Sequence, residues 1–211
     1  MDNVAIRHIH KSDPEYPAAL ERYLAEDAPD SATAKGNLDL LNRLKLAIFC
    51  SATCPAAIVS ETEQVMQKII AAGATVIGGF HSQVEQHCLK ILLAGDQPII
   101  LSPARSLDKL RIRPEYKEPL NNGRLLFLSF FRSHRHRSDV EMAFKRNLYV
   151  AALADRILIV HASRSSKTEE LCQKIIGWQK PVYTISDEAN QNLVRLGAQE
   201  TEGSNGGWIS G

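Results

Sequence analysis

Short apolar runs alternate with longer segments of helical periodicity, and this alternation limits the possible folds more than any other feature of the sequence. Strands of a parallel sheet are buried on both faces, so they are continuous apolar runs. Helical segments between such runs indicate βαβ units, so the sequence predicts an α/β fold: a doubly wound, mainly parallel sheet with helices on both faces. The runs of strand length are 44–50, 74–79, 97–101, 124–130, 156–162 and 181–185.

Three capping boxes, each with a serine followed three residues later by glutamate, predict helix starts at Ser60, Ser138 and Ser166. The segment 103–123 is basic and contains proline, and we expect it to be irregular. The predicted helices span 60–73, 81–95, 138–154, 166–177 and 187–196.

The length of 211 residues suits one domain with a sizeable core. We expect an N-terminal lead-in segment over 1–43 and the folded domain over 44–198. The glycine-rich end, 199–211, is predicted to be a disordered tail.

The net charge of +1 excludes non-specific nucleic-acid binding by overall charge, but the charge is unevenly placed. Residues 1–30 carry seven acids and three bases, whereas 105–146 carry eleven bases and five acids. The basic region is either a solvated face or an electrostatic contact for a polyanion. No apolar run has the ~18–20 residues of a membrane span, and the N-terminus lacks the apolar core of a signal peptide. With only four cysteines, the sequence suggests a cytoplasmic protein.

Ligands of doubly wound sheets bind beyond the carboxyl ends of the strands. The segment 51–54 follows the first apolar run and is rich in hydroxyl groups; it is either a phosphate-binding turn or a plain turn. A dinucleotide fingerprint is missing there. Gly78 and Gly79 follow the second run, and they either let a ligand approach the backbone or form a tight turn. The loops to inspect follow Cys50, Gly79, Leu101, Phe130 and Ala162.

The segment 130–137 interleaves arginines with aromatic and histidine residues at the end of the fourth run. Such a composition suits phosphates and stacked bases, although a solvated basic loop is the alternative. The cysteines and histidines lack the paired spacing of a zinc site, and no nucleophile motif is visible. We therefore expect no metal, no cofactor and no catalytic site.

Seven segments form an ordered set of motifs: DPEYPAAL (13–20), KGN (35–37), LKLAIFCSA (44–52), ATVIGGFHSQVEQHCLKILLAG (74–95), AFKRNLYVAALADRILIVHA (143–162), SKT (166–168) and LVRLGA (193–198). In this order they resemble the Rossmann-like domain of the DNA-processing protein A (DprA, or Smf) family. The resemblance extends over residues 11–199.

The sequence departs from the family's motifs at several positions. Only Ser51 remains of the family's G-S-R turn, where Cys50 replaces the glycine and Ala52 the arginine. The other replacements are Gln83 for glycine, Glu85 for aspartate, Leu89 for histidine, Leu148 for arginine, His161 for glutamate and Lys167 for glycine.

The resemblance implies a non-catalytic homodimer that binds single-stranded DNA and passes it to RecA in DNA uptake and recombination. Two alternatives remain: a nucleotide-binding sensor or nucleoside-phosphate-processing protein, and a degenerate scaffold that only dimerises. The candidate DNA- or phosphate-binding residues are Ser51, Gly79, Arg132, Arg135, Arg137, Arg146, Asn147, Ser166 and Lys167.

Two further expectations concern helices. Arg146 is expected in the first third of its helix, exposed to phosphate, so that its replacement by alanine would hardly change stability; the alternative is an ion pair with Glu141 or Asp155. The last predicted helix offers Leu193, Val194 and Leu196 either for dimer contacts or for ordinary packing onto the sheet.

Overall fold

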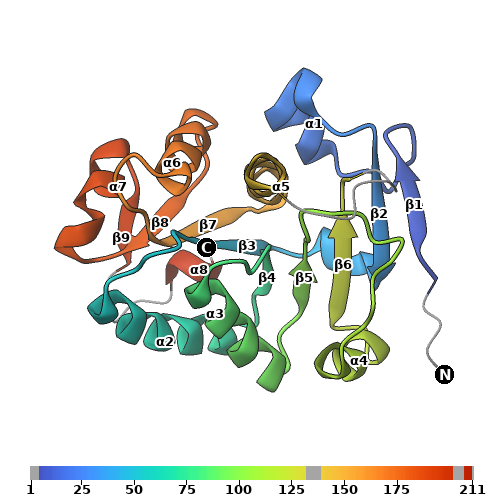
Figure 1. The fold of residues 1–211 in the computed structure, drawn as a ribbon, viewed down its shortest axis with the longest axis horizontal. Helices are drawn as coiled ribbons and strands as arrows, with labels where there is room; N and C mark the ends of the chain where they lie inside the picture. Colours follow the sequence, from blue (N-terminus) through green and yellow to red (C-terminus); the bar gives the residue numbers. More distant parts are fainter. Residues whose placement is uncertain (1–4, 132–138, 202–206, 211) are drawn as a thin grey trace.

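The computed structural model describes residues 5–131, 139–201 and 207–210. Within these residues nine strands form one sheet in the order β1-β2-β6-β5-β4-β3-β7-β8-β9 (Figure 1). The strands are β1 (Arg7–His10), β2 (Ser31–Gly36), β3 (Lys45–Cys50), β4 (Thr75–Gly78), β5 (Ile99–Leu101), β6 (Leu125–Ser129), β7 (Arg156–His161), β8 (Val182–Ile185) and β9 (Gln199–Thr201).

The strands from β6 to β9 in this order are all parallel, whereas β2 is antiparallel to both β6 and β1. From β3 the chain adds β4, β5 and β6 on one side, and it then returns to place β7 on the other side of β3. The carboxyl ends of β3 and β7 therefore flank the point where the strand order reverses, which is where open α/β sheets bind ligands.

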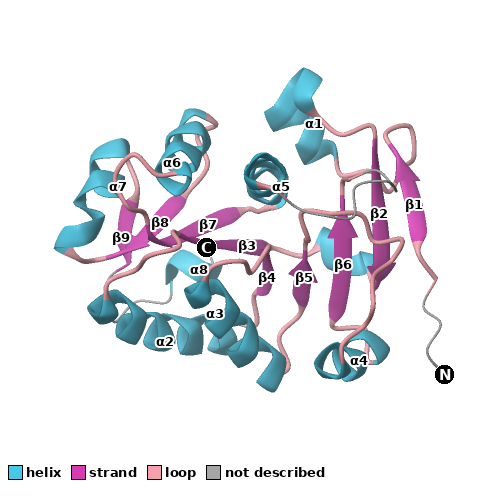
Figure 2. Ribbon diagram, in the orientation of Figure 1, coloured by secondary structure: helices cyan, strands magenta, loops and turns pink. Residues whose placement is uncertain are grey.

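Helices cover both faces of the sheet, as predicted. In Figure 2, α1, α5, α6 and α7 lie on one side and α2, α3 and α4 on the other. The described helices are α1 (Ala18–Leu24), α2 (Ala56–Ala71), α3 (Gln83–Ala94), α4 (Pro114–Asn121), α5 (Val140–Leu153), α6 (Lys167–Gly177), α7 (Gln191–Leu196), α8 (Gly207–Ser210) and the short 3-10 helices η1 (Ala25–Asp27), η2 (Leu38–Asn42) and η3 (Glu188–Asn190).

Alternate residues of the central strand β3 belong to the two separate cores. Ala47 and Phe49 pack into the core beneath α5 and α6, whereas Leu46 and Ile48 pack into the core beneath α2 and α3. This period of two places Leu46, Ala47, Ile48 and Phe49 against the helices on one face or the other, and it explains why these consecutive residues are all apolar.

Two helix starts differ from the capping-box predictions. The helix α2 begins at Ala56, after Pro55, so Ser60 lies inside it. Ile58 is fully buried in the core, and this packing extends the helix upstream of the predicted cap. The N-cap of α5 is Asp139, whose carboxylate accepts a hydrogen bond from the Met142 amide at 2.7 Å. Ser166 does cap α6, as predicted.

The segment 103–123, expected to be irregular, contains the helix α4. Pro114 lies in its first turn, where the missing amide hydrogen has no cost. Tyr116 of α4 packs edge-on against Phe127 of β6, with ring centroids 5.5 Å apart. This long-range contact orders a helix that local composition does not predict.

The expected lead-in segment over 1–43 contributes β1 and β2 to the sheet. Gly36 ends β2 at a positive φ of 128°, and a Cβ atom there would overlap the Leu125 carbonyl oxygen. Asn37 then donates from Nδ2 to the Gly123 carbonyl at 3.0 Å. The KGN motif thus lets β2 lie against β6.

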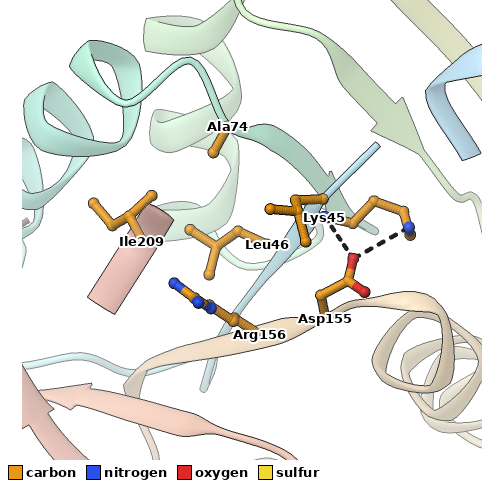
Figure 3. A pocket seen from close by; sticks show the side chains of 7 residues that line it. Lys45, Leu46, Ala74, Asp155, Arg156 and Ile209 are labelled. Carbon is orange, nitrogen blue, oxygen red and sulfur yellow. Dashed lines mark hydrogen bonds and ion pairs between the residues drawn. The ribbon is translucent and has the colours of Figure 1, made fainter. Parts of the chain in front are cut away.

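Within the expected disordered tail, residues 199–201 and 207–210 instead form β9 and α8. The strand β9 pairs with β8, and Ile209 of α8 is buried. The ring of Trp208 packs on that of Tyr183, with ring centroids 5.0 Å apart. Arg156 donates to the Trp208 carbonyl at 2.7 Å. These contacts lie at the amino ends of β3 and β7, beside a small pocket (Figure 3) lined by Leu44, Lys45, Leu46, Ala74, Asp155, Arg156 and Ile209.

Among the described helices, none is both long and apolar enough to span a membrane.

Candidate nucleic-acid interface

A cluster of hydroxyl groups joins the carboxyl ends of β3 and β7. Ser51 follows β3, and its amide donates to the His161 carbonyl at 2.9 Å. Its hydroxyl oxygen accepts from the Ser163 amide at 3.1 Å and lies 3.3 Å from the Ser166 hydroxyl. The Thr53 hydroxyl lies 3.2 Å from that of Ser163. The two turns at the reversal of strand order are thus held together by hydroxyl groups.

The helix α6 begins at this cluster, so its free amides face the carboxyl edge of the sheet. Ser166 caps it by accepting from the Glu169 amide at 3.2 Å. Two exposed bases, Arg164 and Lys167, flank the cap. Lys167 pairs with Glu170 at 2.7 Å, and its ammonium lies 5.1 Å from the ring centre of Phe144. Amides, hydroxyls and bases at one helix start suit an anion.

Arg146 and Gly79 form a second group at the same edge, at the ends of β4 and β5. Arg146 lies midway along α5 and is only 3% exposed. Its Nη1 donates to the Ser102 carbonyl at 2.9 Å, and its Nε donates to the Asn147 side chain at 2.7 Å. A Cβ atom on Gly79 would overlap the guanidinium, so glycine at this position makes room for it.

A buried carboxylate connects the two groups. Glu85 of α3 is 5% exposed and accepts from two backbone amides, that of Cys50 at 2.9 Å and that of His81 at 2.7 Å. Cys50 precedes Ser51, and His81 lies two residues after Gly79. One side chain therefore fixes the turn after β3 against the turn after β4.

Opposing effects act on the pKa values of Glu85 and Arg146. Loss of water raises the pKa of Glu85, while the amide hydrogen bonds and the charge of Arg146 act in the other direction. Burial lowers the pKa of Arg146, and the charge of Glu85 opposes that change. Each ion therefore offsets part of the other's desolvation cost, as expected for charges in the interior.

The structure corrects two sequence expectations about Arg146. It lies in the middle of α5 rather than the first third, and it is buried rather than exposed. Its hydrogen-bond partners are Ser102 and Asn147, not Glu141 or Asp155. The burial arises because β4, β5 and α3 close around the guanidinium, which the local sequence does not reveal.

The predicted site residues fall into two sets at one sheet edge. Ser51, Ser166 and Lys167 gather around β3 and β7, and Gly79, Arg146 and Asn147 gather around β4 and β5. The predicted contacts Arg132, Arg135 and Arg137 lie outside the described residues.

Sequence reasoning missed three contributors to this edge. Glu85 completes a capping-box pattern with Ser82, which was an available signal. Arg164 lies between Ser163 and Ser166, in the loop after Ala162 that the sequence marked for inspection, and its basic side chain was the available signal. Asn192 of α7 donates to the Ala162 carbonyl at 3.0 Å and to Glu169 at 2.6 Å, bracing the turn after β7.

In the described part of the chain, no group of three or more histidine, cysteine and acidic side chains is arranged to hold a metal ion. The cysteines are all free thiols, and burial raises the pKa of Cys50, Cys54, Cys88 and Cys172.

Two solved structures of DNA processing protein A are similar in fold to this chain. DNA processing protein A from Streptococcus pneumoniae has a TM-score of 0.77 at 20% identity, over 95% of this chain and 72% of that one. DNA processing protein A from Helicobacter pylori, a protein described for its single-stranded DNA binding mode, has a TM-score of 0.75 at 20% identity, over 94% and 92%.

A more distant likeness is to the molybdenum cofactor binding protein of Rippkaea orientalis. Its TM-score is 0.53 at 11% identity, over 76% of this chain and 90% of that one. No curated protein sequence matches the chain.

The family model of DNA recombination-mediator protein A matches residues 7–204, which include β1, β2 and β9 as well as the central strands. The extent of this match agrees with the sheet, in which the N-terminal and C-terminal strands are integral. The chain belongs to the DNA recombination-mediator protein A family.

Proposed function

We propose that the chain binds single-stranded DNA at the carboxyl edge of its sheet and acts in DNA uptake and recombination. The observation that carries the proposal is the hydroxyl cluster of Ser51, Ser163 and Ser166 at the reversal of strand order, in a chain that belongs to a DNA-processing family. The similar protein from Helicobacter pylori is described as binding single-stranded DNA, which supports the same ligand class.

The chemistry of this edge suits phosphate esters. The first amides of α6 and the serine hydroxyls offer hydrogen-bond donors, while Arg164 and Lys167 supply positive charge. Arg146 and Glu85 lie beneath this surface as positioning residues, because both are buried. The proposal requires binding and positioning of DNA and no bond-making step.

Titration of fluorescent oligo-dT at two salt concentrations tests the proposal. Each phosphate neutralised on a single strand adds ~0.7 to the log–log slope, so three or four contacts predict a slope of about −2 to −3. Absence of binding at ~50 mM salt, where such contacts are strong, would contradict DNA binding.

A double variant at the start of α6 tests whether this part of the sheet edge binds the DNA. Arg164→Gln with Lys167→Gln is expected to weaken oligo-dT binding by roughly tenfold or more, because hydrogen bonds to charged groups contribute ~1.5–3 kcal/mol each. Lys174→Gln with Arg195→Gln removes the same charge from exposed positions elsewhere on α6 and α7. Equal affinity of the two variants would remove the α6 start from the site.

A nucleoside monophosphate as competitor distinguishes DNA from a small-nucleotide ligand. We expect millimolar concentrations of it to leave oligo-dT binding nearly unchanged, because a single phosphate makes only a fraction of the contacts. Tight nucleotide binding without oligo-dT binding would favour the nucleotide sensor instead.

We also propose that the chain forms a homodimer and delivers DNA to RecA. Of the candidate dimer residues, Leu193 is fully buried, whereas Val194 and Leu196 are partly exposed on α7. Light scattering at tens of micromolar tests the dimer, and a monomer there contradicts it. Co-elution of RecA with the DNA-loaded protein tests the second partner, and separate elution contradicts it.

A further inference from the structure

A basic segment runs from the carboxyl edge of the sheet toward α4, and the proposed site does not include it. It comprises four exposed bases between β5 and α4: Arg105, Lys109, Arg111 and Arg113. The only acid within 105–113 is Asp108. We call these four residues the β5–α4 basic segment.

The backbone of this segment is fixed to the sheet, so its bases are displayed on an ordered support. The Arg105 carbonyl accepts from the Ser129 hydroxyl at 2.7 Å. Leu107 is fully buried, and the Leu110 amide donates to the Leu107 carbonyl at 2.8 Å. The Ser106 hydroxyl accepts from the Asp108 amide at 3.1 Å.

Basic and apolar residues alternate in the second half of the segment. Leu110 and Ile112 pack against the core, while Lys109, Arg111 and Arg113 are exposed. Lys109 lies in the turn that the hydrogen bond between the Leu110 amide and the Leu107 carbonyl closes, and Arg111 and Arg113 follow this turn. Because Leu110 and Ile112 pack against the core, all three bases face solvent.

These bases are available to an external anion. Of the four, only Arg113 has an ion pair among the described residues, a 3.8 Å contact with Glu115 in which the arginine side chain is 72% exposed. Arg105, Lys109 and Arg111 have no ion pair among the described residues, and a group of such exposed cations attracts a polyanion.

The segment is continuous with the proposed site. Ser102, at the end of β5, accepts from buried Arg146, and its amide donates to the Gly78 carbonyl at 2.8 Å. Arg105 follows three residues later. The β5–α4 basic segment therefore begins where the end of β5 meets the group formed by Arg146 and Gly79.

We propose that the β5–α4 basic segment is a second phosphate-contact track, which holds single-stranded DNA extending beyond the serine cluster. This inference rests on the proposed function and adds a prediction that the serine cluster alone does not make. The affinity for DNA depends on strand length, and the dependence resides in these bases.

The test compares two oligo-dT lengths: about 5 nucleotides, near the lower end of the ~4–16 nucleotides that single-strand-binding folds cover, and about 20 nucleotides, above that range. The test variant carries Lys109→Gln, Arg111→Gln and Arg113→Gln. The matched control carries Arg43→Gln, Lys174→Gln and Arg195→Gln, which also removes one exposed lysine and two exposed arginines.

We expect the test variant to bind the long oligonucleotide about tenfold to a hundredfold more weakly than the control, with a salt slope shallower by ~2. Its affinity for the short oligonucleotide stays that of the control. Equal affinity of both variants for the long oligonucleotide overturns the track and leaves the proposed function intact. Failure of the native protein to bind either length overturns both.

A measurement on the native protein provides a check that does not depend on the variants folding. Lys109 is exposed, so an amine-reactive reagent labels it in the free protein. The long oligonucleotide is expected to protect Lys109 severalfold, and the short one is not. Labelling of Lys109 that is unchanged by saturating long oligonucleotide overturns the track.

Discussion

The guanidinium group of Arg146 occupies the space that a side chain at Gly79 would need, since a Cβ atom on Gly79 would overlap it. Ser102 and Asn147 hold the guanidinium in this position through hydrogen bonds. The glycine after β4 therefore serves an internal contact in this protein.

Gly79→Ala is expected to reduce stability by about 1–3 kcal/mol, the usual cost of an extra methyl group in a tightly packed place. To make room, Arg146 must give up its bond to Ser102. Thermal unfolding measures the loss. Gly177→Ala is the control, because no atom lies within 4 Å of its Cβ position, and it should gain up to ~1 kcal/mol. Equal melting temperatures for the two variants would contradict the steric account.

Arg146→Met is expected to reduce the free energy of unfolding by about 2–4 kcal/mol, since it leaves Glu85 without its compensating charge and Ser102 without its donor. Urea denaturation measures the effect. Lys145→Met changes the exposed neighbour and should stay within ~0.5 kcal/mol of the native protein. A native-like stability for Arg146→Met would contradict a stabilising role for the buried guanidinium.

Burial raises the pKa of Glu85, so its contribution to folding stability decreases as pH rises. Between the ordinary value of 4.5 and the raised value, the folded protein binds more protons than the unfolded chain. Stability from this group is therefore full below pH 4.5 and is lost as pH rises through the folded pKa. Denaturation of the native protein and of Glu85→Gln from pH 4 to 8 should show the difference between them changing in that direction. The exposed Glu61→Gln should follow the native profile, and identical profiles for all three would refute the role of Glu85.

Lys180 caps the end of α5, and Lys180→Met is expected to lower stability by at least ~2 kcal/mol. Its ammonium donates to the carbonyls of Ala151, Ala152 and Ala154 and lies 4.1 Å from the ring centre of Tyr23. The substitution leaves these buried carbonyls without a donor. Calorimetry measures the loss, and Lys174→Met, at an exposed position, is the matched control. Equal melting of the two variants would contradict the capping role.

The same lysine gives a second, separable prediction. Burial lowers the pKa of Lys180 from 10.5 to about 8, so between these values the unfolded chain binds more protons than the folded one. Stability from this group therefore rises as pH increases from about 8 to 10.5, and it is lost as pH falls through 8. The native protein should show this rise relative to Lys180→Met. A constant difference across that range would show that the amine stays protonated in the fold.

Local sequence determined the central architecture. Apolar runs such as 44–50 and 156–162 became β3 and β7, because a strand buried on both faces is apolar at most of its positions. The Ser166 cap of α6 was also predictable, since a hydroxyl side chain can satisfy a free amide of the first turn without help from elsewhere. The loops after these strands were expected to meet at one edge of the sheet, because parallel strands end together, and Ser51, Ser163 and Ser166 do gather there.

Only the tertiary structure decided the roles of individual residues at that edge. The local sequence predicts Arg146 to be a surface base. In the structure it contacts Gly79 and Ser102, which follow β4 and β5 and lie 67 and 44 residues earlier in the chain. The same holds for β2 and for α8, whose pairing with β6 and packing near β7 depend on partners more than 90 and 50 residues away. Periodicity and capping are properties of neighbouring residues. The burial of a charge is a property of everything that packs around it, and the sequence does not display that locally.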